Sequence, residues 1–542
     1  MKPQNNGANE NRHFILPNRH KIWLCMLFSL MPSGVLFGRH RDTAAGPDEQ
    51  ACADLVGAKG TPWSVTSAEF VRPPFTITYG KSVVTVSVAF CRVAGITQPA
   101  AGSEIHFELW LPPRGDWNGK LAGVGSGGSR GVIEYGALWR GLERKYVTLA
   151  TDNGHHSEQG FDVSWALGHP ERIIDFGYRA QHSVTVAGKV LIQQFYGHSP
   201  RHSYFIGCSQ GGHHGLTEAQ RFPDDYDGIL AGAPAYSWTN EMAGQAWNVN
   251  ALRQIPEGAL RKEKLALLHQ AVAKACAGVD GLIEDPRRCS FDPAAIECKT
   301  ADGNSCLTAE EVAAVRKLYD GPRTSAGVQI YPGLTRGGEG EWDRLWSDPK
   351  HLGGSWEGFY RYMVHDNPAW DLVTLNFDRD PALAKEKLGG ILDPDNPDLS
   401  LFAGGGGKLI VYHGWGDDMV PAQVSVDYRA LLTSKLGESR VNQFFRLFMI
   451  PGMAHCGGGP GANVLFHSEK PNAVPLEPER DMLTTLEQWV EQGRAPSKFV
   501  ASRVNEQGVV ERTRLICAYP SLAKYRGEGD VARAESFACS TK

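Results

Sequence analysis

The pentapeptide Gly207-Cys208-Ser209-Gln210-Gly211 most constrains what this chain can fold into. It fits the pattern Gly-x-Ser-x-Gly, in which the glycines leave room for a tight turn between a strand and a helix. The flanking sequence agrees, because an apolar run at 203–206 precedes the turn and helical sequence at 215–220 follows it. The pattern therefore predicts a serine hydroxyl held out of a sheet at a helix N-terminus.

A second segment, Gly127-Gly128-Ser129-Arg130-Gly131, fits the same pattern. Both segments follow a strand and precede helical sequence, so local context leaves two candidate nucleophiles. We favour Ser209, because it comes after about three core strands and has a cysteine beside it, as His455 does. The loop at Gly127 and Gly128 then has another role, since such folds place an oxyanion-binding N–H after an earlier strand.

Strand and helix patterns alternate along the chain, which favours a mostly parallel sheet. The expected strands are 75–79, 82–90, 105–111, 120–124, 146–151, 203–206, 227–232, 408–413 and 445–450, with a helix at 177–196. The alternation stops between 236 and 403, a Trp-rich and loop-rich stretch with one clear helix at 309–319 after an N-cap at Thr308. We therefore expect an α/β-hydrolase core with a large inserted lid domain. Its parts are a signal peptide and tail at 1–45, core at 46–235, lid at 236–403 and core again at 404–542.

The partners of a serine nucleophile in this fold follow it in the order acid, then histidine. Asp417 and Asp418 both come just after the strand at 408–413, and His455 lies on a glycine-rich loop after the strand at 445–450. In the expected roles, Ser209 attacks an acyl carbonyl, His455 takes and returns its proton, and the aspartate orients the imidazole ring. The residues alone leave the choice between the two aspartates open.

Composition and the N-terminus narrow the class of protein. The formal net charge of −5 gives no reason to expect nucleic acid or an anionic membrane as a partner. Basic residues precede a short apolar run at 22–31, which predicts an export signal, a secreted or periplasmic location and no membrane association after its removal. Apart from Cys25 there are ten cysteines, an even number that suits an oxidising compartment. One connectivity would pair neighbours along the chain, but pairing does not follow from sequence.

Taken together, five segments resemble the tannase and feruloyl esterase family, which includes mono(2-hydroxyethyl) terephthalate hydrolases. These segments are 151–155, 207–212, 221–235, 413–417 and 452–456. The resemblance implies a triad of Ser209, Asp417 and His455, and so favours Asp417 over Asp418. It also implies a Cys208–Cys456 disulfide and an oxyanion hole made by backbone N–H groups of Gly127 or Gly128 and of Gln210.

We therefore expect a secreted serine carboxylic ester hydrolase that works through an acyl-enzyme. The resemblance alone implies that its substrates are small esters of aromatic acids, of feruloyl, galloyl or terephthalate monoester type. An amidase or peptidase with the same triad, or an inactive binding protein on a hydrolase scaffold, are the alternatives. The oligomeric state is left open by the sequence.

A metal site is not expected in this chain. Lids of the family often hold a structural Ca²⁺ in an aspartate-rich loop, but the matching segment here, 276–286, is about four residues short and lacks two of the aspartates. Ca²⁺ takes six or more oxygen ligands. We therefore expect no required cofactor and no family-like calcium site, although Asp280, Glu284 and Asp285 remain as oxygen donors.

Overall fold

The computed structural model describes residues 46–80, 82–255, 260–299, 305–343, 355–470 and 473–541. The signal peptide and tail expected at 1–45 lie outside the described residues. None of the described helices is long and apolar enough to cross a bilayer.

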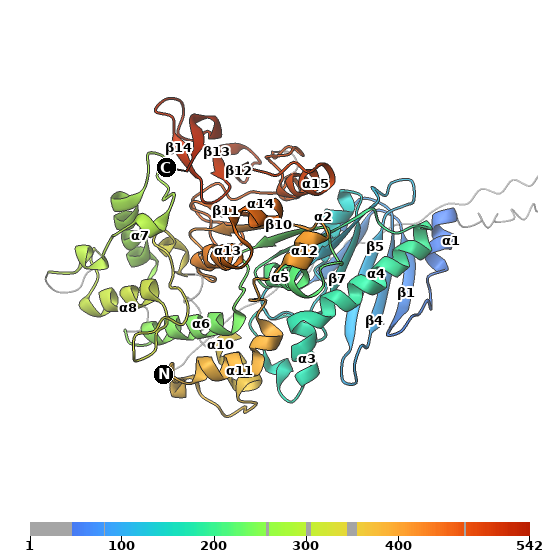
Figure 1. The fold of residues 1–542 in the computed structure, drawn as a ribbon, viewed down its shortest axis with the longest axis horizontal. Helices are drawn as coiled ribbons and strands as arrows, with labels where there is room; N and C mark the ends of the chain where they lie inside the picture. Colours follow the sequence, from blue (N-terminus) through green and yellow to red (C-terminus); the bar gives the residue numbers. More distant parts are fainter. Residues whose placement is uncertain are drawn as a thin grey trace, which may run out of the picture. The chain divides into compact units, whose positions relative to one another are not determined.

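A nine-stranded mixed sheet is the centre of the described chain (Figure 1). Its strands, in spatial order, are β1 (Trp63–Val71), β4 (Phe90–Thr97), β5 (Ile105–Leu111), β7 (Val147–Thr151), β6 (Lys120–Val124), β8 (His202–Cys208), β9 (Gly228–Gly232), β10 (Lys408–Gly414) and β11 (Phe445–Ile450). Neighbours from β7 to β11 are parallel. Neighbours from β1 to β7 are antiparallel. The sequence predicted a mostly parallel sheet, and the observed sheet is parallel only in the half that carries the serine turn.

Helices cover both faces of this sheet. They are α1 (Pro47–Ala53), α2 (Tyr135–Glu143), α3 (Pro170–Ile174), α4 (Ala180–Tyr196), α5 (Gln210–Arg221), α13 (Gln423–Leu436), α14 (Glu438–Phe444) and α15 (Met482–Gln492). Phe205 and Val411 belong to a buried cluster with residues of α5 and α13, whereas Tyr204 and Ile410 belong to a second cluster with residues of α15. Side chains of a strand alternate between its two faces, and here both faces are covered by helices. The central strands are therefore apolar along their whole length.

The expected strand at 82–90 is wrong in one respect, because the run forms two strands. β3 (Ser82–Val86) pairs with β2 (Phe75–Tyr79) in a separate hairpin, and β4 begins only at Phe90. The chain changes partners between them, since β4 pairs with β1 and β5. Both ends of the interruption, Val86 and Phe90, are fully buried, so the apolar run continued although the strand did not.

The segment between β9 and β10 contains more helix than expected. Its helices are α6 (Trp238–Leu252), α7 (Lys262–Cys276), α8 (Ala309–Asp320), α10 (Ser355–Gly358), α11 (Asp380–Leu392) and α12 (Ser400–Gly404). The helix at 309–319 is confirmed as α8, and Thr308 and Glu311 cap it reciprocally. We missed α6 because most of its residues are buried, which removes the alternation of apolar and polar faces. The boundaries at 236 and 403 stay a prediction.

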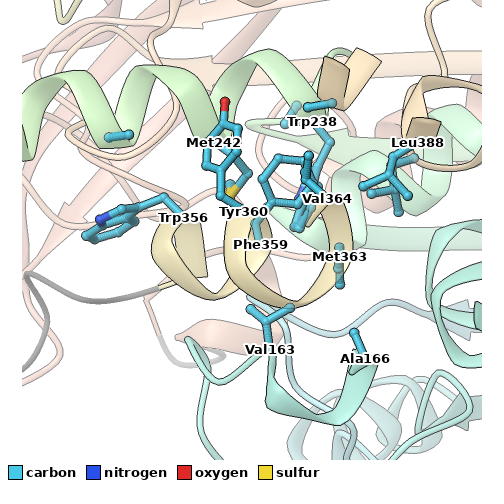
Figure 2. Close-up of a cluster of buried hydrophobic side chains, with 14 of the residues drawn as sticks. Val163, Ala166, Trp238, Met242, Trp356, Phe359, Tyr360, Met363, Val364 and Leu388 are labelled. Carbon is cyan, nitrogen blue, oxygen red and sulfur yellow. The ribbon is translucent and has the colours of Figure 1, made fainter. Parts of the chain in front are cut away.

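A buried cluster joins this segment to the core (Figure 2). Trp238 and Met242 come from α6, and Phe359 comes from the π-helix Phe359–Val364. They meet Val163, which follows the core strand β7. The cluster thus fixes α6 and the π-helix against the core loop around residue 163.

Five disulfides link the described cysteines. They are Cys52–Cys91, Cys208–Cys456, Cys276–Cys289, Cys298–Cys306 and Cys517–Cys539. Four join near neighbours in sequence, and the fifth spans 248 residues. After β11 the chain forms two further hairpins, β12 (Lys498–Val504) with β13 (Val510–Cys517), and β14 (Leu522–Tyr525) with β15 (Phe537–Ser540).

Candidate active site

Ser209 occupies the turn between β8 and α5. Its backbone has φ 62° and ψ −123°, a conformation that costs a non-glycine residue energy and is typical of functional turns. The neighbouring glycines make the turn possible, since a Cβ on Gly207 would lie 2.4 Å from the backbone carbon of Gly211. Ser209 therefore projects from the sheet at the start of a helix, as the pentapeptide predicts.

The second candidate serine is used differently. Ser129 is buried, and its hydroxyl donates to the carbonyl oxygens of Gly160 and Asp162, both at 3.0 Å. Its backbone φ is not among the positive values found in the chain. The geometry thus favours Ser209 as the nucleophile and gives Ser129 the task of holding the loop at 160–162.

His455 and Asp417 are joined by a hydrogen bond. The Nδ1 of His455 lies 2.8 Å from Oδ2 of Asp417, so this geometry favours Asp417 over Asp418 as the acid. The other oxygen of Asp417 accepts from the N–H groups of Met419 and Val420, at 2.9 and 2.8 Å. The carboxylate is therefore held from both sides.

A second histidine completes the environment of the acid. His413, at the end of β10, lies with Nε2 3.1 Å from Oδ2 of Asp417 and with Nδ1 2.7 Å from the Ser425 hydroxyl. The sequence shows His413 only as the last residue of the expected strand at 408–413. Its link to Asp417 depends on the turn after β10, which brings residues 413 and 417 together.

Interactions between Asp417 and His455 shift the pKa values of both side chains. Burial raises the pKa of Asp417, but the charge of His455 and the hydrogen bonds from His413 and His455 outweigh it and hold that pKa well below its ordinary range. Burial lowers the pKa of His455, but Asp417 outweighs it through charge and hydrogen bonding, and the pKa is raised overall. An ionised acid that supports a protonated imidazole is the arrangement general base catalysis needs.

The Cys208–Cys456 disulfide connects the residues next to Ser209 and His455. Its Cα atoms are 5.9 Å apart. Because each cysteine is the immediate neighbour of a functional residue, the bond ties the histidine loop directly to the end of β8. This is the pairing that the resemblance implies.

Both glycines proposed for the oxyanion hole line the same cavity as Ser209 and His455. Gly127, Gly128, Ser209 and His455 all line a cavity of about 860 Å³. Gln210 is the first residue of α5, where the backbone N–H groups have no partner within the helix. Its side chain turns inward and lies 3.2 Å from Nδ1 of His213, so this neighbouring histidine packs behind the turn.

The residues that remain of the calcium loop do not fit a calcium ion. Asp280 and Glu284 both pair with the guanidinium of Arg514, whose side chain is 3% exposed. Asp285 instead binds Arg287, with Nη2 at 2.7 Å. Among the described residues, no group of three or more histidines, cysteines and carboxylates could hold a metal ion. A guanidinium takes the place that a cation would need.

The sequence is similar to that of known esterases over most of its length. The family model described as tannase and feruloyl esterase matches residues 91–540. An uncharacterized esterase of Xanthomonas campestris is 35% identical, over 90% of this chain and 91% of its own. Feruloyl esterase B of Aspergillus niger is 31% identical, over 85% of this chain and 88% of its own.

Solved structures show the same relationship. Feruloyl esterase B from Aspergillus oryzae superposes with a TM-score of 0.83 at 29% identity, covering 91% of this chain and all of its own. The tannin acyl hydrolase from Aspergillus niger superposes with a TM-score of 0.72 at 21% identity, over 91% of this chain and 94% of its own, which shows a shared fold.

Proposed function

Because this chain belongs to the tannase and feruloyl esterase family, and is thus a carboxylic ester hydrolase with an α/β-hydrolase fold, we propose that it cleaves esters of aromatic acids through an acyl-enzyme on Ser209. The hydrogen bond between His455 and Asp417, beside a serine in a strained turn, carries the proposal. An amide substrate would need the same triad, but no observation favours it.

Acylation uses the three side chains in sequence. Oγ of Ser209 attacks the ester carbonyl while Nε2 of His455 takes the hydroxyl proton, and Asp417 holds Nδ1–H and stabilises the imidazolium. Backbone N–H groups of Gln210 and of Gly127 or Gly128 stabilise the negative charge on the carbonyl oxygen. The carbon–oxygen bond to the alcohol then breaks, and His455 returns the proton to the leaving oxygen.

Deacylation repeats these steps with water. Water attacks the acyl carbon and gives a proton to His455, which passes it to Oγ of Ser209 as the acid leaves. The disulfide supports both steps, because it keeps the histidine loop at the serine turn. No step requires a metal ion or a cofactor.

Two features support an aromatic acid as the acyl group. The relatives named feruloyl esterase cover most of the chain, and the large cavity has aromatic side chains, Phe161 and Tyr362, in its wall. Its volume of about 860 Å³ lies in the range of small-molecule sites. The feruloyl, galloyl and terephthalate monoester types stand as members of the proposed class.

We also infer secretion or periplasmic export, and function without calcium. Five disulfides and the N-terminal sequence pattern support export. The ion pairs of Arg514 support independence from calcium, because both carboxylates already pair with a side chain of the protein itself.

Hydrolysis of an ester panel tests the function. Purified, oxidised protein is assayed with methyl gallate, methyl ferulate, mono(2-hydroxyethyl) terephthalate and p-nitrophenyl acetate, beside the variants Ser209→Ala and Ser129→Ala. We expect hydrolysis of the aromatic esters, lost in Ser209→Ala and retained in part in Ser129→Ala. Activity that survives in Ser209→Ala would show that the nucleophile is elsewhere, and inactivity on every ester would overturn the proposal.

A further inference from the structure

A small inner cavity adjoins the nucleophile. It has a volume of about 40 Å³ and is lined by Ser209, Gln210 and residues of α6. Figure 2 shows Trp238 and Met242 of α6 near Trp356 in one buried cluster, and all three side chains also line this cavity. The cavity shares Gly128, Phe161, Ser209 and Met419 with the large cavity, so the two spaces meet at the serine.

The inner cavity lies on the acyl side of the scissile bond. The leaving alcohol must lie next to His455, because His455 returns a proton to its oxygen. His455 lines the large cavity but is not among the described residues around the inner one. Ser209 and Gln210, which hold the acyl carbon and its oxyanion in the proposed mechanism, line the inner cavity.

The lining of the inner cavity includes an acidic side chain. Glu241 is 8% exposed, and its carboxyl is hydrogen-bonded to Gln245 of the same helix. The Nε2 of Gln245 in turn donates to the carbonyl oxygen of Met419 at 2.7 Å. Burial raises the pKa of Glu241 to about 8, and the opposing effects of His455 and Gln245 are too weak to offset it. At neutral pH the carboxyl therefore carries a proton that it can donate.

A second polar group, an indole N–H, belongs to another side chain in the wall of the inner cavity. Trp356 is 4% exposed and lines the inner cavity, and no described residue accepts a hydrogen bond from its Nε1–H. A buried donor without an acceptor is unfavourable, and a ligand oxygen that accepts its hydrogen bond would remove that penalty. A carboxyl and an unpartnered indole N–H beside the acyl position are the groups that would bind an oxygen atom.

We propose that Glu241 is a specificity-determining residue, which together with Trp356 binds an oxygen substituent, such as a hydroxyl, on the acyl part of the substrate. The inference rests on the proposed function, since it assigns the inner cavity to the acyl group of an ester. A volume of about 40 Å³ is close to that of one water molecule in the liquid. The ring of the acyl group would thus lie where the two cavities meet, and only its hydroxyl would enter the inner one.

The test compares matched esters that differ only in the acyl hydroxyl. Methyl benzoate and its meta- and para-hydroxy derivatives share one leaving alcohol, so the ratio of their kcat/KM values reports acyl recognition alone. The unmodified protein should prefer one hydroxylated ester by at least about tenfold, because its site leaves polar groups unpaired with the plain ring.

Two substitutions at position 241 separate hydrogen bonding from shape. Glu241→Leu should lose the preference about tenfold while still hydrolysing methyl benzoate, and Glu241→Gln should keep part of it. Glu310→Gln, on the exposed start of α8, is the control and should leave the ratio unchanged. If Glu241→Leu does not fold, Trp356→Phe removes the indole N–H together with part of the ring and should also reduce the ratio.

The outcomes also distinguish this inference from the function on which it rests. An unchanged ratio in Glu241→Leu or, where that variant does not fold, in Trp356→Phe would overturn the inference, as would a plain ring preferred by the unmodified protein. In either case hydrolysis that depends on Ser209 would leave the proposed function standing. Failure of the unmodified protein to hydrolyse any ester would overturn both.

Discussion

At the scale of single residues, Asp417 is the point on which the site depends. It is 1% exposed and is held by His455, by His413 and by two backbone N–H groups. A buried carboxylate is stable only when its charge is compensated, and here the compensation is the imidazole that does the chemistry. The contacts that orient His455 are therefore the same contacts that compensate the charge of Asp417.

The substitution Asp417→Asn should reduce kcat on the order of 10³ to 10⁴-fold, because the neutral amide no longer stabilises the imidazolium. The control is Asp418→Asn, at the neighbouring buried carboxylate, because Nδ1 of His455 is hydrogen-bonded to Asp417. Initial rates on methyl ferulate measure both. Equal losses in the two variants would contradict the assignment of Asp417 as the acid.

The pH dependence follows from the raised pKa of His455. The base must be neutral to accept the proton, so kcat/KM should fall at low pH with a midpoint above the ordinary imidazole pKa of 6.5. Asp417 raises that pKa, and its removal should move the midpoint to lower pH in the residual activity of Asp417→Asn. A pH–rate profile of both proteins measures the shift, and a midpoint that does not move would contradict the coupling.

At the scale of elements, two links hold the loops of the site. The disulfide joins the ends of β8 and of the turn after β11, across 248 residues of sequence. In the chain-entropy model so long a loop contributes roughly 5 kcal/mol to stability. The second link is Arg514 on β13, which joins the hairpin of β12 and β13 to the loop at 280–284. Leu282 of this loop lies against Gly452, at the start of the histidine loop.

The double variant Cys208→Ala with Cys456→Ala should lose activity more than it loses structure, because the histidine loop is no longer fixed to the serine turn. Circular dichroism and turnover are measured together. The matched control, Cys298→Ala with Cys306→Ala, removes a disulfide with a sequence separation of only 8 and should keep its turnover. Unaltered turnover in the first variant would refute a role of the bond in the site.

The ion pairs of Arg514 predict a response to calcium and to its removal. A chelator should leave the melting temperature and activity of the unmodified protein unchanged. Arg514→Ala should lower the free energy of unfolding by about 3 to 5 kcal/mol, because it leaves the buried Asp280 without its partner. A melting temperature that rises with added calcium in the unmodified protein would show that a metal site exists after all.

At the scale of the whole molecule, the sequence predicts the parts that follow local rules. The glycines around Ser209, the alternation of strands and helices and the cap at Thr308 are local signals, and the structure has all three. The chain order of acid and histidine after Ser209 is a property of the fold, which pointed to His455 and to either Asp417 or Asp418. Only the family resemblance favoured Asp417 over Asp418.

What the sequence did not predict depends on contacts between distant segments. No sequence pattern marks Glu241 as a site residue, because its position beside the nucleophile appears only when α6 and Trp356 line the inner cavity. The break between β3 and β4 reflects a change of strand partner, which an apolar run cannot reveal. Helix α6 was likewise not predicted, because it is buried on several sides and its sequence therefore lacks the apolar and polar alternation of a surface helix.

The most direct test of the account is to locate the covalent adduct formed with a serine-directed aryl phosphonate. The purified protein is inactivated, digested and analysed by mass spectrometry, with and without prior incubation with methyl ferulate as a competitor. We expect one adduct per chain, on the peptide that contains Ser209, formed more slowly when the ester is present. An adduct on the peptide containing Ser129, or no adduct at Ser209 in protein that hydrolyses esters, would contradict the assignment of Ser209 as the nucleophile.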